Sequence, residues 1–421
     1  MTRSDGYRVG ATLALALTVA EGARRLLTPR EPSISPAPVL LADYFSPEEI
    51  DRGRRYARPQ RALGLTATAI SLAAIAALTL RPPPWLHRAG ERPVAGAAAA
   101  ATVLSLGFAL LTLPVTALAR RRAIAAGLDT QDWAAWARDQ ALAGALQSGF
   151  ATGAGAGVIA ATRRWPQTWW VAGAAGSVGF GAVLAALAPV LLAPIFNEFT
   201  PLPEGETRDD VLALADAAGV TVGELYSVDA SRRTTAANAY VTGLGPTKRV
   251  VLYDTLLDRY GRDEIRVVVA HELGHVRFRD VPRSVVFAAV TAPAAVLAVQ
   301  RLSWALSRER GTPATLPGLA LATGVVSVPL GMIGNRLSRA VERRADQYSL
   351  QLTGASDAFV SFEHAIALQN MADLTPPRWV TTLMASHPPV GERIGAAVAF
   401  AQREPQRERQ PVPPDAASSR R

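Results

Sequence analysis

Four long runs without a single charged residue constrain most strongly how this chain can fold. They are 62–80, 93–119, 140–162 and 168–196. Each is near or above the roughly 20 residues that a helix needs to cross the hydrocarbon core of a bilayer. Only 19% of the chain is charged, against roughly 25% in ordinary soluble domains. The sequence therefore predicts a mostly α-helical integral membrane protein.

Three weaker apolar segments raise the predicted number of membrane helices to seven. Segments 284–299, extending through residue 304, and 312–335 follow a polar region. The segment 9–27 is interrupted by Glu21 and followed by arginines, so a signal peptide is the alternative there. A retained helix is preferred because no clear cleavage site follows it.

The arginines between these segments predict the orientation of the chain. The loops between consecutive apolar segments are here called joints and are numbered from the N-terminus. The first, third and fifth joints carry more arginine than the second, fourth and sixth, and arginine-rich loops stay in the cytoplasm. The polar region 197–283, which is the fifth joint, and the C-terminus are therefore expected to be cytoplasmic. The net charge of +9 sits mostly at the ends of apolar runs, so no nucleic-acid partner is expected.

The polar region 197–283 is expected to form a small α+β unit. Residues 207–218 have helical periodicity, whereas 224–230, 237–243 and 248–254 alternate or run apolar as strands do. A second helix is expected to start at Asp263 and to continue through the sequence VVVAHELGHV.

This second helix carries the most informative motif, His-Glu-x-x-His. His271 and His275 are two of only five histidines in the chain, and positions four apart lie on one face of a helix. Two imidazoles so placed can hold zinc, and Glu272 beside them can take a proton from a water molecule. The alternative is a buried helix with two incidental histidines.

A catalytic zinc needs a third protein ligand, and the chain has no cysteine to supply it. Glu342 lies on a predicted helix after the last apolar segment and is a candidate ligand. Asp346, one turn later, is a candidate to orient a ligand histidine. The alternative is an exposed charged helix in which neighbouring arginines pair with both acids.

Two further segments have possible roles around such a site. His387 precedes two prolines in the sequence SHPPVGERI and could stabilise an oxyanion, although a surface loop is the alternative. Asn238 and Tyr240 lie in a predicted strand whose free edge could pair with an extended peptide. A strand without substrate contact is the alternative for these two residues.

Taken together, these residues resemble the M48 metallopeptidases, and within them the Ste24-like CAAX prenyl protease group. The resemblance covers nearly the whole length in separate blocks that occur in order. The blocks are YFSPEEIDRGRRYARPQ, PIFNEFTPLPEG, ANAYVTGLGPTKRVVLYDTLL, VVVAHELGHV, SRAVERRADQYSL and SHPPVGERI. Membrane proteases of the HtpX type resemble the chain less well, because they are shorter and have fewer helices before the motif.

The resemblance implies seven membrane helices around a large internal chamber, and a zincin-like domain whose zinc site closes the cytoplasmic end. It implies one zinc per chain, with His271, His275 and Glu342 as ligands and Glu272 as the general base. It also implies that Asp346 supports a ligand histidine. It implies that Asn238 and His387 contact the substrate or the transition state.

The expected organisation has three parts. Residues 1–196 form a membrane domain with about five helices, and 197–402 form the peptidase domain with two further helices at about 284–304 and 312–335. Residues 403–421, rich in Pro, Arg, Gln and Ser, are expected to be a disordered tail.

The function predicted from the sequence is that of a membrane-embedded zinc metalloendopeptidase that hydrolyses peptide bonds with an activated water. The alternatives are a quality-control protease of the HtpX type, a non-catalytic M48-like scaffold, and a channel or transporter. The partners expected are the lipid bilayer and a peptide or membrane-protein substrate. A composition rich in alanine and arginine suggests the cytoplasmic membrane of a bacterium, and the oligomeric state is left open.

Overall fold

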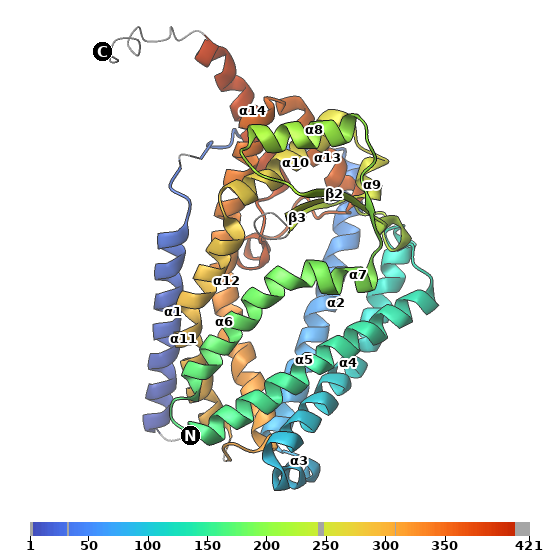
Figure 1. The fold of residues 1–421 in the computed structure, drawn as a ribbon. Coiled ribbons are helices and arrows are strands. Elements are labelled where there is room, and N and C mark those ends of the chain that lie inside the picture. Colours follow the sequence, from blue (N-terminus) through green and yellow to red (C-terminus); the bar gives the residue numbers. More distant parts are fainter. Residues whose placement is uncertain (1–2, 32, 243–247, 308, 409–421) are drawn as a thin grey trace, which may run out of the picture.

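A computed structural model describes every residue except 1–2, 32, 243–247, 308 and 409–421. The chain is mostly helical, which confirms the predicted fold class at this level. Long helices form one end of the molecule, and a small sheet covered by shorter helices lies at the other end (Figure 1).

All seven predicted apolar segments lie in long helices. In the N-terminal half these are α1 (Arg3–Leu27), α2 (Pro47–Leu80), α4 (Pro93–Ala125), α5 (Trp133–Arg164) and α6 (Trp169–Leu187). A short helix α3 (Pro84–Arg88) precedes α4, and a π-helical turn (Ala188–Leu192) joins α6 to α7 (Ala193–Phe196). The two later segments lie in α11 (Asp280–Leu306) and α12 (Leu316–Thr353).

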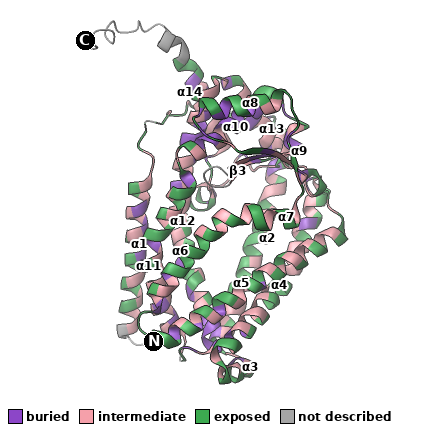
Figure 2. Ribbon diagram, viewed as in Figure 1, coloured by how far each residue is buried: buried purple, intermediate pink, exposed green. Residues whose placement is uncertain are grey.

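Within the described part of the chain, five helices are long and apolar enough to cross a membrane. They are Pro47–Leu80, Pro93–Ala125, Trp169–Phe196, Asp280–Leu306 and Pro313–Thr353. Little of their apolar surface is buried inside the protein, as expected of helices that face lipid (Figure 2). The other two predicted spans, in α1 and α5, are helical but less apolar, because α1 carries charges and α5 is rich in glycine and charged near both ends.

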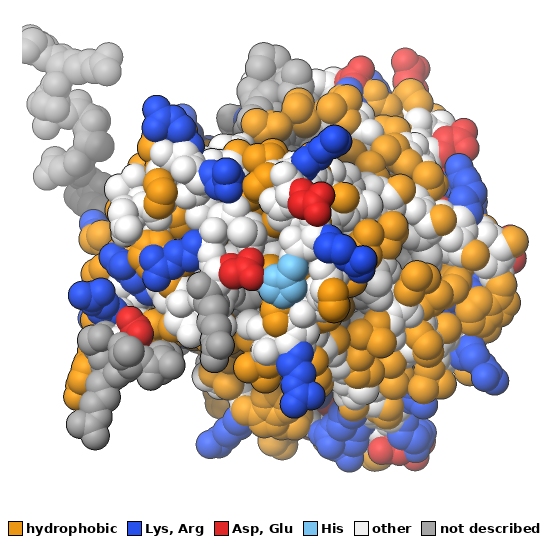
Figure 3. All heavy atoms as spheres, turned by 90° about the horizontal axis from the view of Figure 1, so that it is seen from below, with side chains coloured by type: hydrophobic (Ala, Val, Ile, Leu, Met, Phe, Trp, Pro, Cys, Tyr) orange, Lys and Arg blue, Asp and Glu red, His pale blue; other side chains and the backbone are white. Residues whose placement is uncertain are grey.

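The end of the molecule away from the sheet presents a largely apolar surface with scattered basic side chains (Figure 3). The joints that approach this end carry few arginines, among them Arg88 in α3 and Arg301 in α11. The richer joints lie toward the sheet, where α2 begins with several arginines and α4 ends with Arg120 to Arg122.

The sheet has four strands in the order β1-β2-β4-β3. Its strands are β1 (Phe199–Pro201), β2 (Glu224–Val228), β3 (Ala239–Thr242) and β4 (Arg249–Tyr253). β2 pairs in parallel with β4, and the two outer strands are antiparallel to their neighbours. The three predicted strands are confirmed. The sequence did not reveal β1, which has only three residues and ends in a proline, a residue that edge strands tolerate.

In the described part of the chain, five further helices lie around the sheet. They are α8 (Glu206–Ala217), α9 (Asp254–Leu257), α10 (Arg262–Arg277), α13 (Ser356–Gln369) and α14 (Val390–Glu408). The apolar face of α10, including Val269 and Leu273, packs with Leu252 of β4 and with Phe362 of α13 in a continuous core. This burial fixes α10 so that His271 and Glu272, on its other side, line a cavity.

A sharp turn separates α10 from α11. Arg279 adopts the left-handed conformation, with φ of 55°, which ends α10 and lets α11 leave in a new direction. The helix α12 then contacts both α10 and α11 and runs from the end formed by the long helices to the end that carries the sheet (Figure 1).

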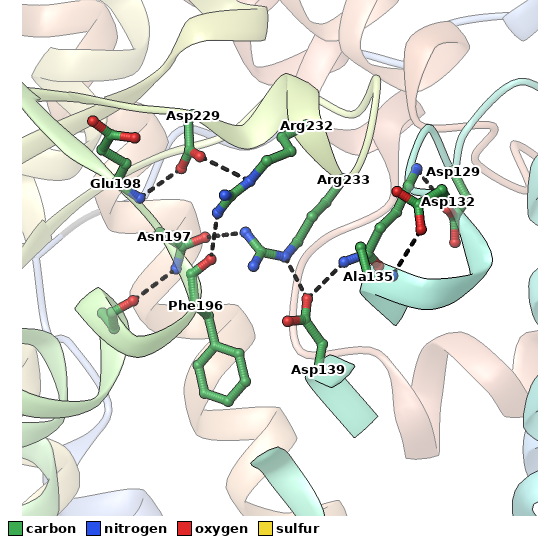
Figure 4. Close-up of polar contacts among 12 residues, drawn as sticks. Asp129, Asp132, Ala135, Asp139, Phe196, Asn197, Glu198, Asp229, Arg232 and Arg233 are labelled. Atoms are coloured by element: carbon green, nitrogen blue, oxygen red, sulfur yellow. Dashed lines mark hydrogen bonds and ion pairs between the residues drawn. The ribbon is translucent and has the colours of Figure 1, made fainter. Parts of the chain in front are cut away.

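A polar cluster ties the membrane helices to the segment that leads into β3 (Figure 4). Arg233 pairs with Asp139 of α5 at 2.9 Å and donates to Asn197, which follows α7, at 3.3 Å. Nearby, Thr234 forms an isolated β-bridge with Asp129 in the α4–α5 loop. These contacts fix the start of β3 relative to the membrane helices.

The first residues of the predicted disordered tail, 403–408, are helical. The helix α14 continues to Glu408, past residue 403, and residues 409–421 lie outside the described part of the chain.

Candidate metal centre

Three predicted ligands meet at one point between α10 and α12. One ligand atom from each of His271, His275 and Glu342 lies within 4.8 Å of the others. The Nε2 atoms of the two histidines are 3.1 Å apart, and Glu342 Oε2 lies 3.4 Å from Nε2 of His271. The i, i+4 spacing on α10 and the crossing of α12 together produce this arrangement.

The donor set fits a zinc ion. Glu342 is buried, and its Oε2 has no hydrogen-bond partner within the described part of the chain. A buried carboxylate oxygen without a partner is unfavourable unless a cation or another donor reaches it. Two imidazoles and one carboxylate are the protein ligands of a common class of catalytic zinc site, in which a fourth position stays open.

A network of charged side chains supports His271. Asp346 Oδ1 lies 2.9 Å from Nδ1 of His271, so Nε2 is left to face the cluster. Arg393 of α14 binds both oxygens of Asp346, at 2.5 and 2.9 Å, and also pairs with Glu363 of α13 at 2.6 Å. Asp346 therefore lies next to a histidine of the cluster. Arg393 and Glu363, which the sequence did not single out, extend the network.

His275 has a corresponding support that sequence reasoning missed. Its Nδ1 donates to Oδ2 of Asp280 at 3.0 Å. The other oxygen of Asp280 accepts from Arg344 of α12, whose guanidinium also lies 4.2 Å from the ring of Phe278. Asp280 is five residues after His275, and only the left-handed turn at Arg279 brings it back to the imidazole. The sequence shows an acid at this position but not that turn.

The buried carboxylates change the proton affinity of His271. Burial alone would lower its pKa, but Asp346 and Glu342 outweigh this effect and raise the pKa to about 10. The pocket therefore favours a positive charge at the position of the imidazoles, which is the electrostatic environment that a bound cation needs.

Glu272 lies on the same helix and turns its carboxyl group toward β3. Burial raises the pKa of this carboxyl above its usual value, although the carboxylate accepts from the amide of Val241. This amide is not used within the sheet. The backbone amide of Tyr253 donates to the carbonyl oxygen of Asn238. Because hydrogen-bonded positions alternate along an antiparallel pair, the amide and carbonyl of Tyr240 face β4, whereas those of Val241 point away from it. A carboxyl group with a raised pKa beside a metal site suits general-base catalysis at neutral pH.

A cavity of about 460 Å³ adjoins these groups. The cavity is lined by His271, Glu272 and Glu342, and most of its other lining residues are apolar. The apolar lining includes Leu256, Val267, Val268, Phe359, Phe362 and Ile366. The cavity is large enough for one or two side chains of a peptide, and the candidate catalytic groups lie at its edge.

Of the remaining predicted residues, His387 and Asn238 line this cavity and Tyr240 does not. His387 Nε2 lies 3.5 Å from Glu342 Oε2, and its side chain is largely exposed. Asn238 is exposed, and its side-chain oxygen accepts from the amide of Ala239 at 2.9 Å. Tyr240 lines a second cavity of about 420 Å³ with Pro189, Phe196 and neighbouring residues. Asn238 directly precedes β3, and it lines a different cavity from Tyr240.

Comparison with protein families gives two adjoining matches. Residues 201–401 match the model of peptidase family M48, and residues 33–198 match that of the CAAX prenyl protease N-terminal region with five membrane helices. The two matches together cover the sheet, the histidine helix and most of the membrane helices.

Similar proteins include bacterial and eukaryotic metalloproteases. An uncharacterized metalloprotease, YhfN, of Bacillus subtilis is 32% identical over 69% of this chain and 71% of its own length. A CAAX prenyl protease 1 homolog of Arabidopsis thaliana is 34% identical over 51% of this chain, and the match spans about half, 52%, of that relative. The crystal structure of S. mikatae Ste24p superposes with a TM-score of 0.77 over 93% of this chain and 98% of that one, at 20% identity, which shows a common fold.

Proposed function

This chain belongs to the M48 peptidase family of zinc-dependent membrane metalloendopeptidases, and we propose that His271, His275 and Glu342 hold one zinc ion per chain. The observation that carries this proposal is the meeting of three ligand atoms within 4.8 Å. In addition, Oε2 of the buried Glu342 has no hydrogen-bond partner among the described residues. Asp346 and Asp280 support the proposal, because each orients one histidine with Nε2 toward the cluster.

The residues around the cluster supply the proton transfers of peptide hydrolysis. When bound, zinc supplies a Lewis acid that lowers the pKa of water toward roughly 7 and polarises the scissile carbonyl. Glu272 accepts the proton of the attacking water and later delivers it to the leaving amine. His387, which faces Glu342, donates a hydrogen bond to the oxyanion that forms on the substrate carbonyl.

The substrate is an extended segment of a peptide or of a membrane protein. β3 is the edge strand nearest the cluster, and the carbonyl groups of Ala239 and Val241 point away from β4, where an extended chain can pair with them. Asn238, which lines the cavity with His271, contacts the substrate close to the cleaved bond. Tyr240 contacts a more distant part through the second cavity.

The proposed topology has seven membrane helices, with α1 and α5 completing the five more apolar ones. Residues 1–196 form the membrane domain, 197–402 form the peptidase domain, and the helices surround an internal chamber. The peptidase part and the C-terminus face the cytoplasm of a bacterial cell, since the arginine-rich joints lie at that end. The family match to the N-terminal five-helix region favours this organisation over that of the shorter HtpX-type proteases.

The zinc content of detergent-purified protein tests the proposal without knowledge of the substrate. We expect one zinc per wild-type chain by elemental analysis, and a large loss of zinc in Glu342→Ala. Glu392→Ala is a matched control. The carboxylate of Glu392 pairs with Arg343, the neighbour of Glu342 on α12, but Glu392 is not part of the cluster. A wild-type protein that stays free of zinc after incubation with the metal would refute the proposed site.

A further inference from the structure

The segment that carries His387 is attached to α12 by an unusual set of contacts. It begins with a π-helical turn, Val380–Met384, between α13 and α14. The last carbonyl groups of such a turn have no partner inside it. Here two side chains of α12 donate hydrogen bonds to the carbonyl oxygens of residues 382–385.

The two side chains are those of Asn335 and Arg339. Asn335 Nδ2 donates to the carbonyl oxygens of Leu383 and Met384 at 3.0 and 3.1 Å. Arg339 donates to the carbonyl oxygens of Thr382, at 3.1 Å, and Ala385. We call Asn335 and Arg339 the carbonyl clamp.

The carbonyl clamp and the candidate metal ligand share one face of α12. Asn335, Arg339 and Glu342 are spaced four and three residues apart, which places them on one stripe of the helix. His387 follows the last clamped carbonyl by two residues and lies 3.5 Å from Glu342. Beyond His387, two prolines stiffen the chain, and Glu392 of α14 pairs with Arg343, again on α12.

The loop around His387 is therefore held to α12 on both sides of the imidazole. Because His387 itself is largely exposed, few packing contacts fix its position. We propose that Asn335 and Arg339 are positioning residues for His387: by holding carbonyl groups 382–385 they keep its imidazole against Glu342, ready to meet the substrate oxyanion. This inference rests on the role proposed for His387 in peptide hydrolysis.

Hydrogen exchange on the full chain in detergent tests the clamp itself. In Asn335→Asp and in Arg339→Ala, the backbone amides of residues 380–387 should exchange at least about tenfold faster than in the wild type, since local opening becomes easier. Arg336→Ala is the matched control, because Arg336 is on the same helix but faces Glu21 at 3.5 Å. Unchanged exchange in both clamp variants would overturn the proposal.

Kinetics test whether the clamp acts through His387. With oxidised insulin B chain as the probe and cleavage followed by mass spectrometry, Arg339→Ala should keep its zinc and lower kcat about 10- to 100-fold with little change in KM, as loss of an oxyanion donor does. In the His387→Ala background, the same substitution should change kcat less than about threefold. Multiplicative effects in the double variant would show that Arg339 acts independently of His387.

The two proposals fail in different ways. Loss of zinc from the wild type would refute the metal site, and the exchange experiment would still decide whether Asn335 and Arg339 hold the loop. Normal zinc with unchanged kcat in the clamp variants would refute the positioning role alone.

Discussion

His275 donates from Nδ1 to Oδ2 of Asp280 at 3.0 Å, across a left-handed turn at Arg279. The carboxylate is buried, and its other oxygen accepts from Arg344 of α12. One acid therefore connects a candidate metal ligand, the start of a membrane helix and the helix that supplies the third ligand. Asp280 thus stands to His275 as the predicted Asp346 stands to His271.

Removal of this carboxylate should weaken zinc binding. We expect Asp280→Ala to bind zinc about 10- to 100-fold less tightly, since partners of ligand histidines have effects of this size. Competition with a coloured chelator measures the affinity. Asp263→Ala, at the exposed start of the same helix α10, is the control and should bind zinc normally. Equal affinities in the two variants would mean that Asp280 is only structural.

Removal of the general base should separate metal binding from turnover. Glu272→Gln keeps the shape of a side chain that is not itself a proposed ligand, so zinc content should stay at the wild-type level. Turnover of insulin B chain should fall about 100- to 10,000-fold, the range expected for loss of general-base catalysis. Substantial residual hydrolysis in this variant would rule out the assignment of Glu272.

The pH dependence of stability should reveal the raised pKa of the Glu363 carboxyl group. Burial raises the pKa of this carboxyl to about 7, in spite of the pairing with Arg393. The pKa in the unfolded chain is lower, so the stabilising contribution is full below about pH 4.5 and is lost as the pH rises through 7. The Tm of the wild type should therefore fall from pH 5 to pH 8 relative to that of Glu363→Gln. The exposed control Glu206→Gln should follow the wild type, and parallel curves for all three proteins would contradict the prediction.

The contact between α2 and the loop after α13 should not tolerate an added methyl group. Gly53 is buried, and a Cβ atom there would overlap the carbonyl oxygen of Ala372. Gly53→Ala should destabilise the protein by about 1–3 kcal/mol, the usual effect of overpacking, and lower the thermal midpoint. Gly64→Ala on the same helix has open space around it and should be neutral or slightly stabilising. Equal midpoints for the two variants would show that this contact is dispensable.

The absence of native cysteine allows a direct test of orientation. Single cysteines at Asp258, beside α9, and at Arg88, in α3, place a thiol at opposite ends of the molecule. In intact cells, a membrane-impermeant maleimide should label Arg88→Cys and leave Asp258→Cys unlabelled until the membrane is opened. The reverse pattern would place the peptidase part outside the cytoplasm.

Much of the secondary structure could be predicted because it depends on local patterns. Apolar runs of membrane length predicted the long helices, alternation predicted β2, β3 and β4, and helical periodicity predicted α8 and α10. The strand β1 was missed because three residues carry too little pattern. The number of membrane spans could not be decided from hydropathy. The helices α1 and α5 are long enough to cross a bilayer, but charged residues in α1 and glycines in α5 lower their hydropathy.

For the candidate site too, local spacing could be predicted from the sequence, whereas contacts between distant segments could not. The i, i+4 spacing placed His271 and His275 on one face of a helix, and Glu342 and Asp346 one turn apart on another, without reference to any fold. Sequence could not show that α10 and α12 cross at these positions, or that Tyr240 would face a different cavity from Asn238.

Short-range periodicity by itself determined the helices, the strands and the chemical type of the site, because these depend on residues within one or two turns of each other. Only the tertiary structure decided which distant side chains complete the site. Arg393 reaches Asp346 from 47 residues away, and Asn335 and Arg339 hold a turn more than 40 residues further along the chain. Asp280 is near in sequence, but the backbone conformation of one residue, Arg279, brings it to His275. Such contacts depend on how buried helices pack, and no local pattern encodes that packing.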